Sequence, residues 1–456
     1  MIAHVLVVSV LVASSVAAGQ AGSQPTEAQL SFTVRLRGNY TRGAVCVSEV
    51  SNLKRARRMS GLGEYTTGAW SPDGRRLAVS GGEPQHRGIR VFTADGSSWS
   101  LASRPRPNER DSAPAWSPDG TTLAFARYVF FGPGVDYSRA GVWLVGSGSS
   151  GERQISRRFA GALAWSPTGD LIAADLGGAF NTEVDLLRET GVLERTIRVG
   201  SPSSFQDGVS WSPDGARLAL GGGAIVDRHG NGIGRYAPAP TSDFVVRAPA
   251  WSPDGSRIAY ERARSRSDAR TNVRVLGNSD LYLGRADGAA PTRLTATPAS
   301  SESAPAWRAN AGRPAGTAQR CAISGTSGRD VVRATPKDDL IDAGSGNDLV
   351  YAGAGNDFVA AGGGNDVLVG GPGRDELWGE NGADGFNARD GARDHLRGGL
   401  GRDRAQADPR HDVVLGVERI SPIRSCCCAG RPVPGRASSS WCAPSTSCRP
   451  RSISPD

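Results

Sequence analysis

Aspartate recurs at a fixed spacing in the C-terminal third of the chain, and each copy closes a glycine-rich stretch. Five copies lie nine residues apart, at Asp348, Asp357, Asp366, Asp375 and Asp384. The residue two positions after each one is apolar, and these partners are Val350, Val359, Leu368, Leu377 and Phe386. Carboxylate and carbonyl oxygens are the ligands that Ca²⁺ prefers, six to eight of them at about 2.3–2.6 Å. The spacing therefore predicts a row of calcium sites.

The glycines of these units can bring carbonyl oxygens toward the same cation as the carboxylate. Glycine tolerates a positive φ, so a six-residue glycine-rich turn can aim its carbonyls inward. The three residues that follow form a short strand, and its apolar residue points to the interior. The candidate ligands are the five aspartates together with Gly344, Gly346, Gly353, Gly355, Gly362, Gly364, Gly371 and Gly373.

One nine-residue unit corresponds to half a turn of a coil, so alternate units stack on the same side. We therefore expect calcium to lie between units eighteen residues apart. One row would join Asp348 with Asp366 and Asp384, and the other would join Asp339 with Asp357 and Asp375. A disordered Gly/Asp-rich linker is the alternative, but a linker has no reason to keep aspartate and an apolar residue in phase.

The repeat resembles the hemolysin-type (RTX) calcium-binding nonapeptides, with the units AGSGNDLVY, AGAGNDFVA, AGGGNDVLV, GGPGRDELW and GENGADGFN. The resemblance implies a parallel β-roll, secretion of an unfolded chain, and folding in the calcium outside the cell. We place this roll at residues 325–420.

Units at both ends of the roll depart from the pattern. The unit ATPKDDLID keeps Asp339 and Ile341 in phase without the glycines, so we expect it to hold the fold and to ligate poorly. After Asn387 the phase slips by one residue, and GGLGRDRAQ restores the motif at Asp403. The segment GVERI, residues 416–420, is expected to cap the roll.

A second repeat, of longer period, fills residues 30–310. Its copies carry a Trp-Ser-Pro-Asp-Gly turn or a variant of it, at Trp70, Trp116, Trp165, Trp211 and Trp251, with a worn sixth copy at Trp307. The spacings of 40–56 residues fit one four-stranded blade of a β-propeller. In the turn, Pro presets φ, Asp bonds to the local backbone and Gly adopts the left-handed conformation. The tryptophan ends the preceding strand and is expected to pack between blades.

These copies resemble TolB-type (WD40-like) propeller repeats, which implies an all-β fold with six blades. The third copy has Thr168 in place of Asp, and the sixth lacks the Pro-Asp-Gly turn. We expect N-terminal strands, around TVRLRG and GAVCVSEV, to complete the last blade and protect its edges. A five-bladed or open arrangement is the alternative. Because the Trp and Asp recur from copy to copy, we interpret them as blade architecture and not as a site.

We expect any binding surface of the propeller, for a protein or glycan partner, to lie on irregular loops. The longest are Ser100–Asp111, Val129–Arg139, Gly221–Ser242 and Glu261–Asn272. The third contains Asp227, His229 and Asn231, which we interpret as a polar turn rather than as a metal site.

The ends of the chain differ from the repeats. An apolar run from Val5 to Val12 precedes small residues, which indicates a secretory signal peptide over residues 1–21. No other segment is apolar enough to span a membrane. We therefore expect a protein secreted by a bacterium to the extracellular space, with the periplasm or the cell surface as alternatives.

We interpret residues 311–324 as a linker and residues 421–456 as a disordered tail rich in Cys, Pro and Arg. Whether Cys46 pairs with Cys321 is left open.

Charge is unevenly distributed along the chain. The whole sequence carries a net charge of +8, whereas residues 325–420 hold 17 acidic and 11 basic residues. The acidic end fits cation binding. The positive charge elsewhere is almost all arginine scattered through loops, so we do not expect nucleic-acid binding.

The sequence contains no catalytic motif that we recognise, such as Gly-x-Ser-x-Gly, His-Glu-x-x-His or a phosphate-binding loop. We therefore expect a calcium-binding protein and not an enzyme, with a propeller that serves as a binding platform. Two alternatives stay open. In one, the propeller is an interaction module and the roll is a structural appendage; in the other, the chain is an extracellular enzyme that uses the mouth of the propeller.

Overall fold

The computed structural model describes most of the chain between residues 29 and 421. The described residues are 29–36, 43–50, 53, 56–61, 63–82, 87–131, 134–146, 151–176, 183–198, 208–241, 243–267, 274–295, 300–308 and 322–421. The expected signal peptide, residues 311–321 of the expected linker, and the tail from residue 422 therefore lie outside the described part. Within it, no helix is long and apolar enough to cross a membrane.

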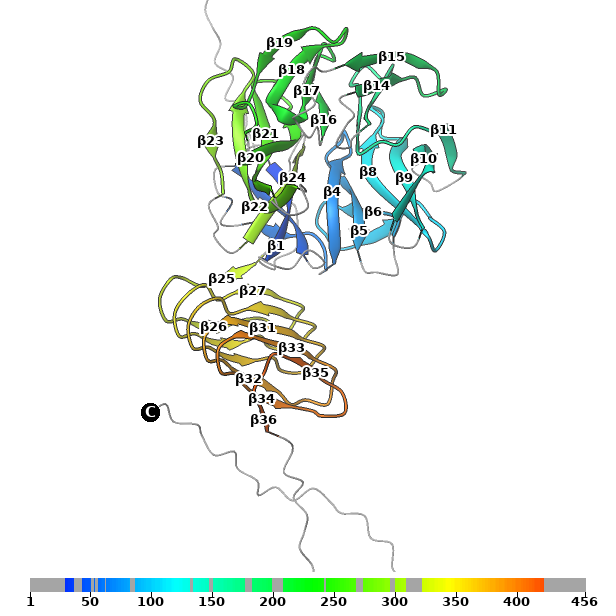
Figure 1. Cartoon of the computed structure of the whole chain (residues 1–456). Coiled ribbons are helices and arrows are strands. Elements are labelled where there is room, and N and C mark those ends of the chain that lie inside the picture. Colours follow the sequence, from blue (N-terminus) through cyan, green and yellow to red (C-terminus); the bar gives the residue numbers. More distant parts are fainter. Residues whose placement is uncertain are drawn as a thin grey trace, which may run out of the picture.

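The described residues fold into a six-bladed propeller followed by a parallel β-solenoid (Figure 1). Three blades come first along the chain: β4 (Glu64–Trp70), β5 (Arg76–Gly82), β6 (Ile89–Thr93) and β7 (Trp99–Leu101); β8 (Glu109–Trp116), β9 (Thr122–Phe131), β10 (Gly134–Gly146) and β11 (Arg153–Ser156); β12 (Ala162–Trp165), β13 (Ile172–Asp175), β14 (Glu183–Leu187) and β15 (Leu193–Arg198). Two more follow: β16 (Val209–Trp211), β17 (Arg217–Leu220), β18 (Ala224–Asp227) and β19 (Gly232–Arg235); β20 (Phe244–Trp251), β21 (Arg257–Ser267), β22 (Arg274–Arg285) and β23 (Thr292–Arg293).

The sixth blade joins the two ends of the propeller. It orders its strands as β24 (Ser300–Arg308), β1 (Gln29–Leu36), β2 (Gly43–Glu49) and β3 (Arg57–Arg58). Gln29 pairs with Arg308 across β1 and β24. The N-terminal strands therefore complete the last blade, as the sequence predicts, and the five-bladed alternative is wrong.

The repeated tryptophans join neighbouring blades. The indole N–H of Trp116 donates to the carbonyl of Ala69 at 3.1 Å, and that of Trp307 to the carbonyl of Ala250 at 2.8 Å. Both rings are at least 92% buried. The worn sixth copy therefore packs as the complete copies do, although it has lost its turn.

The roll contains two parallel sheets of six strands each. One sheet consists of β25 (Ile323–Ser324), β27 (Leu340–Asp342), β29 (Phe358–Ala360), β31 (Glu376–Asn381), β33 (His395–Leu400) and β35 (Val413–Leu415). The other consists of β26 (Val331–Arg333), β28 (Leu349–Tyr351), β30 (Val367–Val369), β32 (Gly385–Ala388), β34 (Arg404–Ala407) and β36 (Arg419–Ser421). Strands that are neighbours in a sheet come from alternate units, which confirms that one unit is half a turn.

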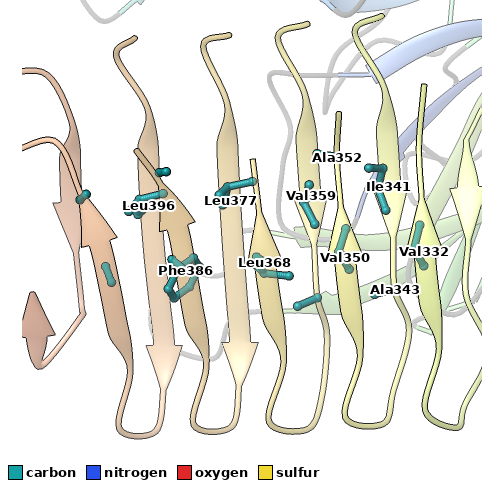
Figure 2. Packing of buried hydrophobic residues seen from close by; sticks show 14 residues of the cluster. Val332, Ile341, Ala343, Val350, Ala352, Val359, Leu368, Leu377, Phe386 and Leu396 are labelled. Carbon is teal, nitrogen blue, oxygen red and sulfur yellow. The ribbon is translucent and has the colours of Figure 1, made fainter. Parts of the chain in front are cut away.

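The apolar residue of every unit points between the two sheets (Figure 2). Val350, Val359, Leu368 and Leu377 are fully buried, and Phe386 is 3% exposed. This core is one side chain thick. Hydrophobic burial at about 25 cal/mol per Å² is therefore small for a segment of this length, and the turns must contribute to its stability.

The roll packs directly against the closing blade of the propeller. The first sheet turns Leu340, Phe358 and Ala360 outward, and they join a buried cluster with Leu30 and Phe32 of β1. Phe358 is fully buried and meets Trp378 edge to face, with 5.2 Å between ring centroids. Arg58 of β3 also donates a hydrogen bond to the carbonyl of Asp338. The two parts therefore share one hydrophobic cluster.

The four expected loops and the end of the expected linker require correction. Gly221–Ser242, expected to be an irregular loop, contains β18 and β19, and the first residues of Glu261–Asn272 extend β21. β18 pairs with β17 and β19 pairs with β18, and the glycines of β19 hide its alternation in the sequence. Similarly, Val129–Arg139 falls largely in β9 and β10, and part of Ser100–Asp111 falls in β7 and β8. Ile323–Ser324, assigned to the linker, is the first strand of the roll.

Candidate metal centre

The glycines of the repeat adopt a backbone conformation that other residues rarely take. In the third unit, Gly362 has φ of +96° and Gly364 has φ of +134°. The same pair of positions in the other central units also has positive φ, and in the fifth unit Glu380 takes the first of them at φ +70°. The turns therefore have the left-handed geometry that the glycine spacing predicts.

Close stacking of the turns is a second reason for glycine. A Cβ on Gly362 would overlap the carbonyl oxygen of Gly344, one full turn earlier, and a Cβ on Gly364 would overlap that of Gly346. Gly363, between them, has nothing within 4 Å of its Cβ position. The glycine turns therefore bring their carbonyl oxygens against the neighbouring turn, in register along the roll.

The aspartates form two continuous rows on the two edges of the roll. In one row the backbone N–H of Asp330 donates to Asp348, that of Asp348 to Asp366, that of Asp366 to Asp384, and that of Asp384 to Asp403. In the other, the N–H donors are Asp339, Asp357, Asp375 and Asp394, and the acceptors are Asp357, Asp375, Asp394 and Asp412. Each bond ends on Oδ1, at 2.7–3.1 Å.

The second oxygen of each central carboxylate is buried and has no hydrogen-bond partner in the described part of the chain. Seven aspartates share this property: Asp348, Asp357, Asp366, Asp375, Asp384, Asp394 and Asp403. An unpaired carboxylate oxygen away from water costs several kcal/mol in its charged form. The repeated buried carboxylate oxygen without a hydrogen-bond partner is therefore the main chemical feature of the roll.

At the ends of the rows, protein donors take the place of the missing partner. Oδ2 of Asp339 accepts from the backbone N–H of Thr335 at 2.8 Å and from its hydroxyl at 2.7 Å. Asp330 is bonded in the same way by Thr326. At the other end, the carboxylate of Asp412 accepts from the N–H of Asp408. Glu418 replaces the next aspartate of the other row as acceptor for the N–H of Asp403. Asp330, Asp339 and Asp412 therefore have internal partners for their carboxylates, as expected for end units that cap the roll.

Burial raises the pKa of Asp357, Asp366, Asp384 and Asp394 well above the ordinary value. Desolvation, with the neighbouring charges of Asp375 and Asp339, raises the pKa of Asp357 to about 8. Desolvation likewise raises the pKa of Asp366 to about 7, with the charges of Asp384 and Asp348 adding to it. Asp394 rises to about 7 and Asp384 to about 6, again chiefly through desolvation. A neighbouring cation would remove this penalty on the charged form.

The donor set fits a hard divalent cation. Its accessible ligands are carboxylate and carbonyl oxygens, with no thiolate or imidazole in the central turns, which suits Ca²⁺ better than zinc or copper. Among the described residues, no three His, Cys, Asp or Glu side chains form a metal-binding group. Backbone carbonyls of the glycine turns would therefore have to supply most of the ligands.

Sequence reasoning found five of the seven aspartates with an unpartnered oxygen. It recognised the motif at Asp403 without including that residue among the candidate ligands, and it did not propose Asp394; both continue the two rows after the phase slip. Asp403 had a usable signal, because Gly399 and Gly401 keep positive φ at the two glycine positions of its unit. Leu396 and Ala405, two residues after each aspartate, are buried in the same core.

A family model provides independent support for the repeat. Residues 324–359 and 361–393 match the RTX calcium-binding nonapeptide repeat, in four copies. The roll consists of RTX repeats. The match covers the five aspartates from Asp348 to Asp384 with their glycine turns, and it ends before Asp394.

Comparisons over the rest of the chain concern the propeller. No curated protein matches the sequence. Among solved structures, TolB from Acinetobacter baumannii is 16% identical with a TM-score of 0.48, over 62% of this chain and 66% of that one, just under two thirds of its length. A TolB homologue from Agrobacterium tumefaciens is 18% identical with a TM-score of 0.39, over 59% and 89% of the two chains.

The polar cluster of the fourth blade is a hairpin turn. The carboxylate of Asp227 accepts the backbone N–H groups of His229 and Asn231 at 2.8 and 2.9 Å, and the Asn231 amide at 2.7 Å. These bonds close the connection between β18 and β19 and use the carboxylate for the turn, in agreement with the interpretation from sequence.

Proposed function

We propose that the protein is a secreted calcium-binding protein in which calcium orders the C-terminal roll, and that the propeller is a binding platform and not a catalyst. The observation that carries the calcium role is the row of buried Oδ2 atoms that lack a partner, in units whose glycine turns stack in register. A cation bound there would neutralise the carboxylates that the thin core cannot stabilise.

Binding to the folded form alone would couple calcium concentration to stability. A ligand at 100 times its dissociation constant adds about 2.7 kcal/mol to the free energy of unfolding for one site. Several sites along one roll would act together, because each row is continuous. Calcium would therefore act as a folding signal at the high concentrations found outside cells.

Two observations support a location outside the cytoplasm. The N-terminal sequence has the pattern of a secretory signal peptide. Cys46, fully buried in the cluster between the propeller and the roll, is disulfide-bonded. Disulfides persist mainly in oxidising compartments. The other six cysteines lie outside the described residues, so the pairing of Cys46 with Cys321 stays open.

Calorimetry of the full-length chain tests the calcium role. Thermal unfolding is recorded with Ca²⁺, with Mg²⁺ and with a chelator. We expect Ca²⁺ to raise the unfolding temperature of the roll, and Mg²⁺ to raise it much less because Mg²⁺ requires a tighter octahedral shell. A triple Asn variant at Asp357, Asp366 and Asp375 should lose the response. Identical unfolding in calcium and in chelator would refute the proposal.

A further inference from the structure

Two blades of the propeller place an arginine beside an aromatic ring at equivalent positions. Arg127 and Arg262 each lie eleven residues after the motif tryptophan, Trp116 or Trp251. Arg127 lies over Trp143 of β10 at 4.9 Å, and Arg262 lies beside Tyr282 of β22 at 5.5 Å from the ring centroid. The blades are on opposite sides of the ring (Figure 1), each separated from the other by two blades. The two arginines therefore form a natural comparison within one chain.

At Arg127 the cation is neutralised by carboxylates. Asp111 lies directly opposite Arg127 on β8, and its two oxygens accept from the guanidinium at 2.6 and 2.8 Å. Glu152 accepts from the third nitrogen at 2.6 Å. The cation and the carboxylate of Asp111 are buried. This guanidinium is fully used by the blade itself.

At Arg262 the strand that corresponds to β8 offers no carboxylate. The residue opposite Arg262 on β20 is Val246, where the other blade has Asp111. Arg262 is instead held between two rings, with its guanidinium carbon 3.8 Å from the centroid of Phe244 and 5.5 Å from that of Tyr282. It makes no hydrogen bond or ion pair with any described residue. Stacking fixes the plane of the guanidinium and leaves its N–H groups available.

Arg262 lines a cavity of about 440 Å³, together with other residues that can donate hydrogen bonds. Arg264 lies on the same wall, and its side chain is exposed and unpaired within the described structure. Ser265 is 4% exposed, and its hydroxyl has no partner among the described residues. A bulge in the pairing of β21 with β22, between Ala263 and Ser265, interrupts the alternation of the strand there.

The remaining charges of the cavity favour an anion. Asp280 lies directly opposite Arg262 on β22, but its carboxylate is paired with Arg293 at 2.7 Å. Asp243 adds one carboxylate at the rim, so the lining carries three arginines against two aspartates. The unpaired groups on the wall are donors, two guanidiniums and one hydroxyl, which an oxyanion can satisfy and a neutral apolar ligand cannot.

We propose that the cavity around Arg262 binds an oxyanion, a carboxylate or a tetrahedral group carried by a small polar molecule. Arg262 supplies a fixed, forked pair of N–H donors, Arg264 supplies a second charge, and Ser265 donates its hydroxyl. The cavity is within the size range of small-molecule sites, about 300–1,000 Å³. A cavity of about 460 Å³ also lies beside Arg127, but there the guanidinium is engaged by Asp111 and Glu152. We therefore do not expect Arg127 to bind an oxyanion.

Isothermal titration calorimetry of the full-length chain tests the proposal. The probes are succinate for the planar oxyanion, inorganic sulfate for the tetrahedral one, and succinamide as the neutral analogue of succinate. We expect saturable binding of at least one oxyanion and none of succinamide. Arg262→Gln should weaken binding about tenfold or more, the usual effect of losing a charge-assisted hydrogen bond. The tighter of the two anions identifies the geometry of the natural group.

Two further variants separate the site from general electrostatics and from misfolding. Arg195→Gln removes the same charge from an exposed position on β15 and should leave binding unchanged. Ser265→Ala removes only the buried hydroxyl and should weaken binding several-fold without loss of the fold, which thermal unfolding monitors. Binding of neither anion overturns the proposal, as does equal binding by the wild type and by both site variants, or equal loss with Arg195→Gln.

Discussion

The backbone N–H of Asp348 donates to Oδ1 of Asp366 at 2.7 Å, across the 18 residues of one full turn of the roll. The same carboxylate keeps its other oxygen, Oδ2, buried and without a partner in the described structure. One oxygen therefore fixes the stacking of the turns, and the other is left for a ligand. This division of roles makes the two contributions of the carboxylate separable by mutation.

Asp366→Asn should keep the stacking and lose the cation. An amide oxygen can accept the N–H of Asp348 as the carboxylate does, but it brings no negative charge to the turn. We expect calcium affinity to fall about tenfold or more, whereas the calcium-free roll should be at least as stable as in the wild type, because a buried charge has been removed. Calcium titration by calorimetry, combined with thermal unfolding in chelator, measures both effects.

The matched control is Asp339→Asn, the same change in a unit whose Oδ2 is bonded by Thr335. The asparagine can accept those bonds, so calcium affinity should change much less than in Asp366→Asn. Equal losses in the two variants would mean that the unpartnered oxygens do not mark the binding sites.

Gly364→Ala should disrupt the roll through its backbone. Gly364 has φ of +134°, and a Cβ there would overlap the carbonyl oxygen of Gly346. Strain of this kind costs about 1–3 kcal/mol before any effect of the overlap. Gly363→Ala is the control, because its Cβ would meet nothing within 4 Å. Chemical denaturation in calcium should show a large loss for the first variant and little change for the second.

Much of the architecture could be predicted because the sequence contains two sets of repeats. Nine-residue and roughly 46-residue periods specify the roll and the blades, and the half-turn rule places Asp348 with Asp366 correctly. The phase slip after Asn387 obscured Asp394, because its unit has an extra residue.

The backbone conformation of the first alanine in the Ala-Pro-Ala-Trp copies could not be predicted from the sequence. Ala113 and Ala248 have positive φ, at 50° and 47°, and each lies at a bulge in the pairing of its strand.

Contacts between the repeats were harder to predict than the repeats themselves. Phe358 and Leu340 occupy outward positions, at which a solvent-exposed strand would have polar residues. That departure from alternation was a usable signal for a covered face. The partner strand β1 lies about 300 residues earlier in the sequence, and no local pattern connects the two. The Arg262 cavity is likewise produced by strand register, not by a motif.

The turn aspartates should make the propeller sensitive to acid. The hydroxyl of Ser117 donates to Asp119 at 2.5 Å, and this bond, with that from the Thr121 N–H, lowers the pKa of Asp119 to about 2. The folded pKa lies below the unfolded value of about 3.9. The contribution of this carboxylate is therefore complete above pH 4 and is lost as pH falls toward 2.

Asp119→Asn tests this linkage, since asparagine can close the turn without titrating. The unfolding midpoint of the variant should lie below that of the wild type at pH 6, and the two should converge as pH approaches 2. A constant difference across this range would show that the charge of Asp119 is not what stabilises the turn. The third blade, which has Thr168 at this position, supplies the precedent for a turn without the carboxylate.

Phe358→Ala should uncouple the roll from the propeller. Phe358 is fully buried in the cluster that contains Leu30 and Phe32 of the closing blade, and loss of a buried Phe costs about 3–5 kcal/mol. In the wild type, calcium that stabilises the roll should also raise the unfolding temperature of the propeller through this shared cluster. In the variant, calorimetry should resolve two transitions, and calcium should shift only that of the roll.

Val367→Ala is the matched control and should leave the coupling intact. Val367 holds the equivalent outward position of the other sheet, where its side chain is 46% exposed. A calcium response of the propeller that survives Phe358→Ala would mean that the shared cluster does not transmit it.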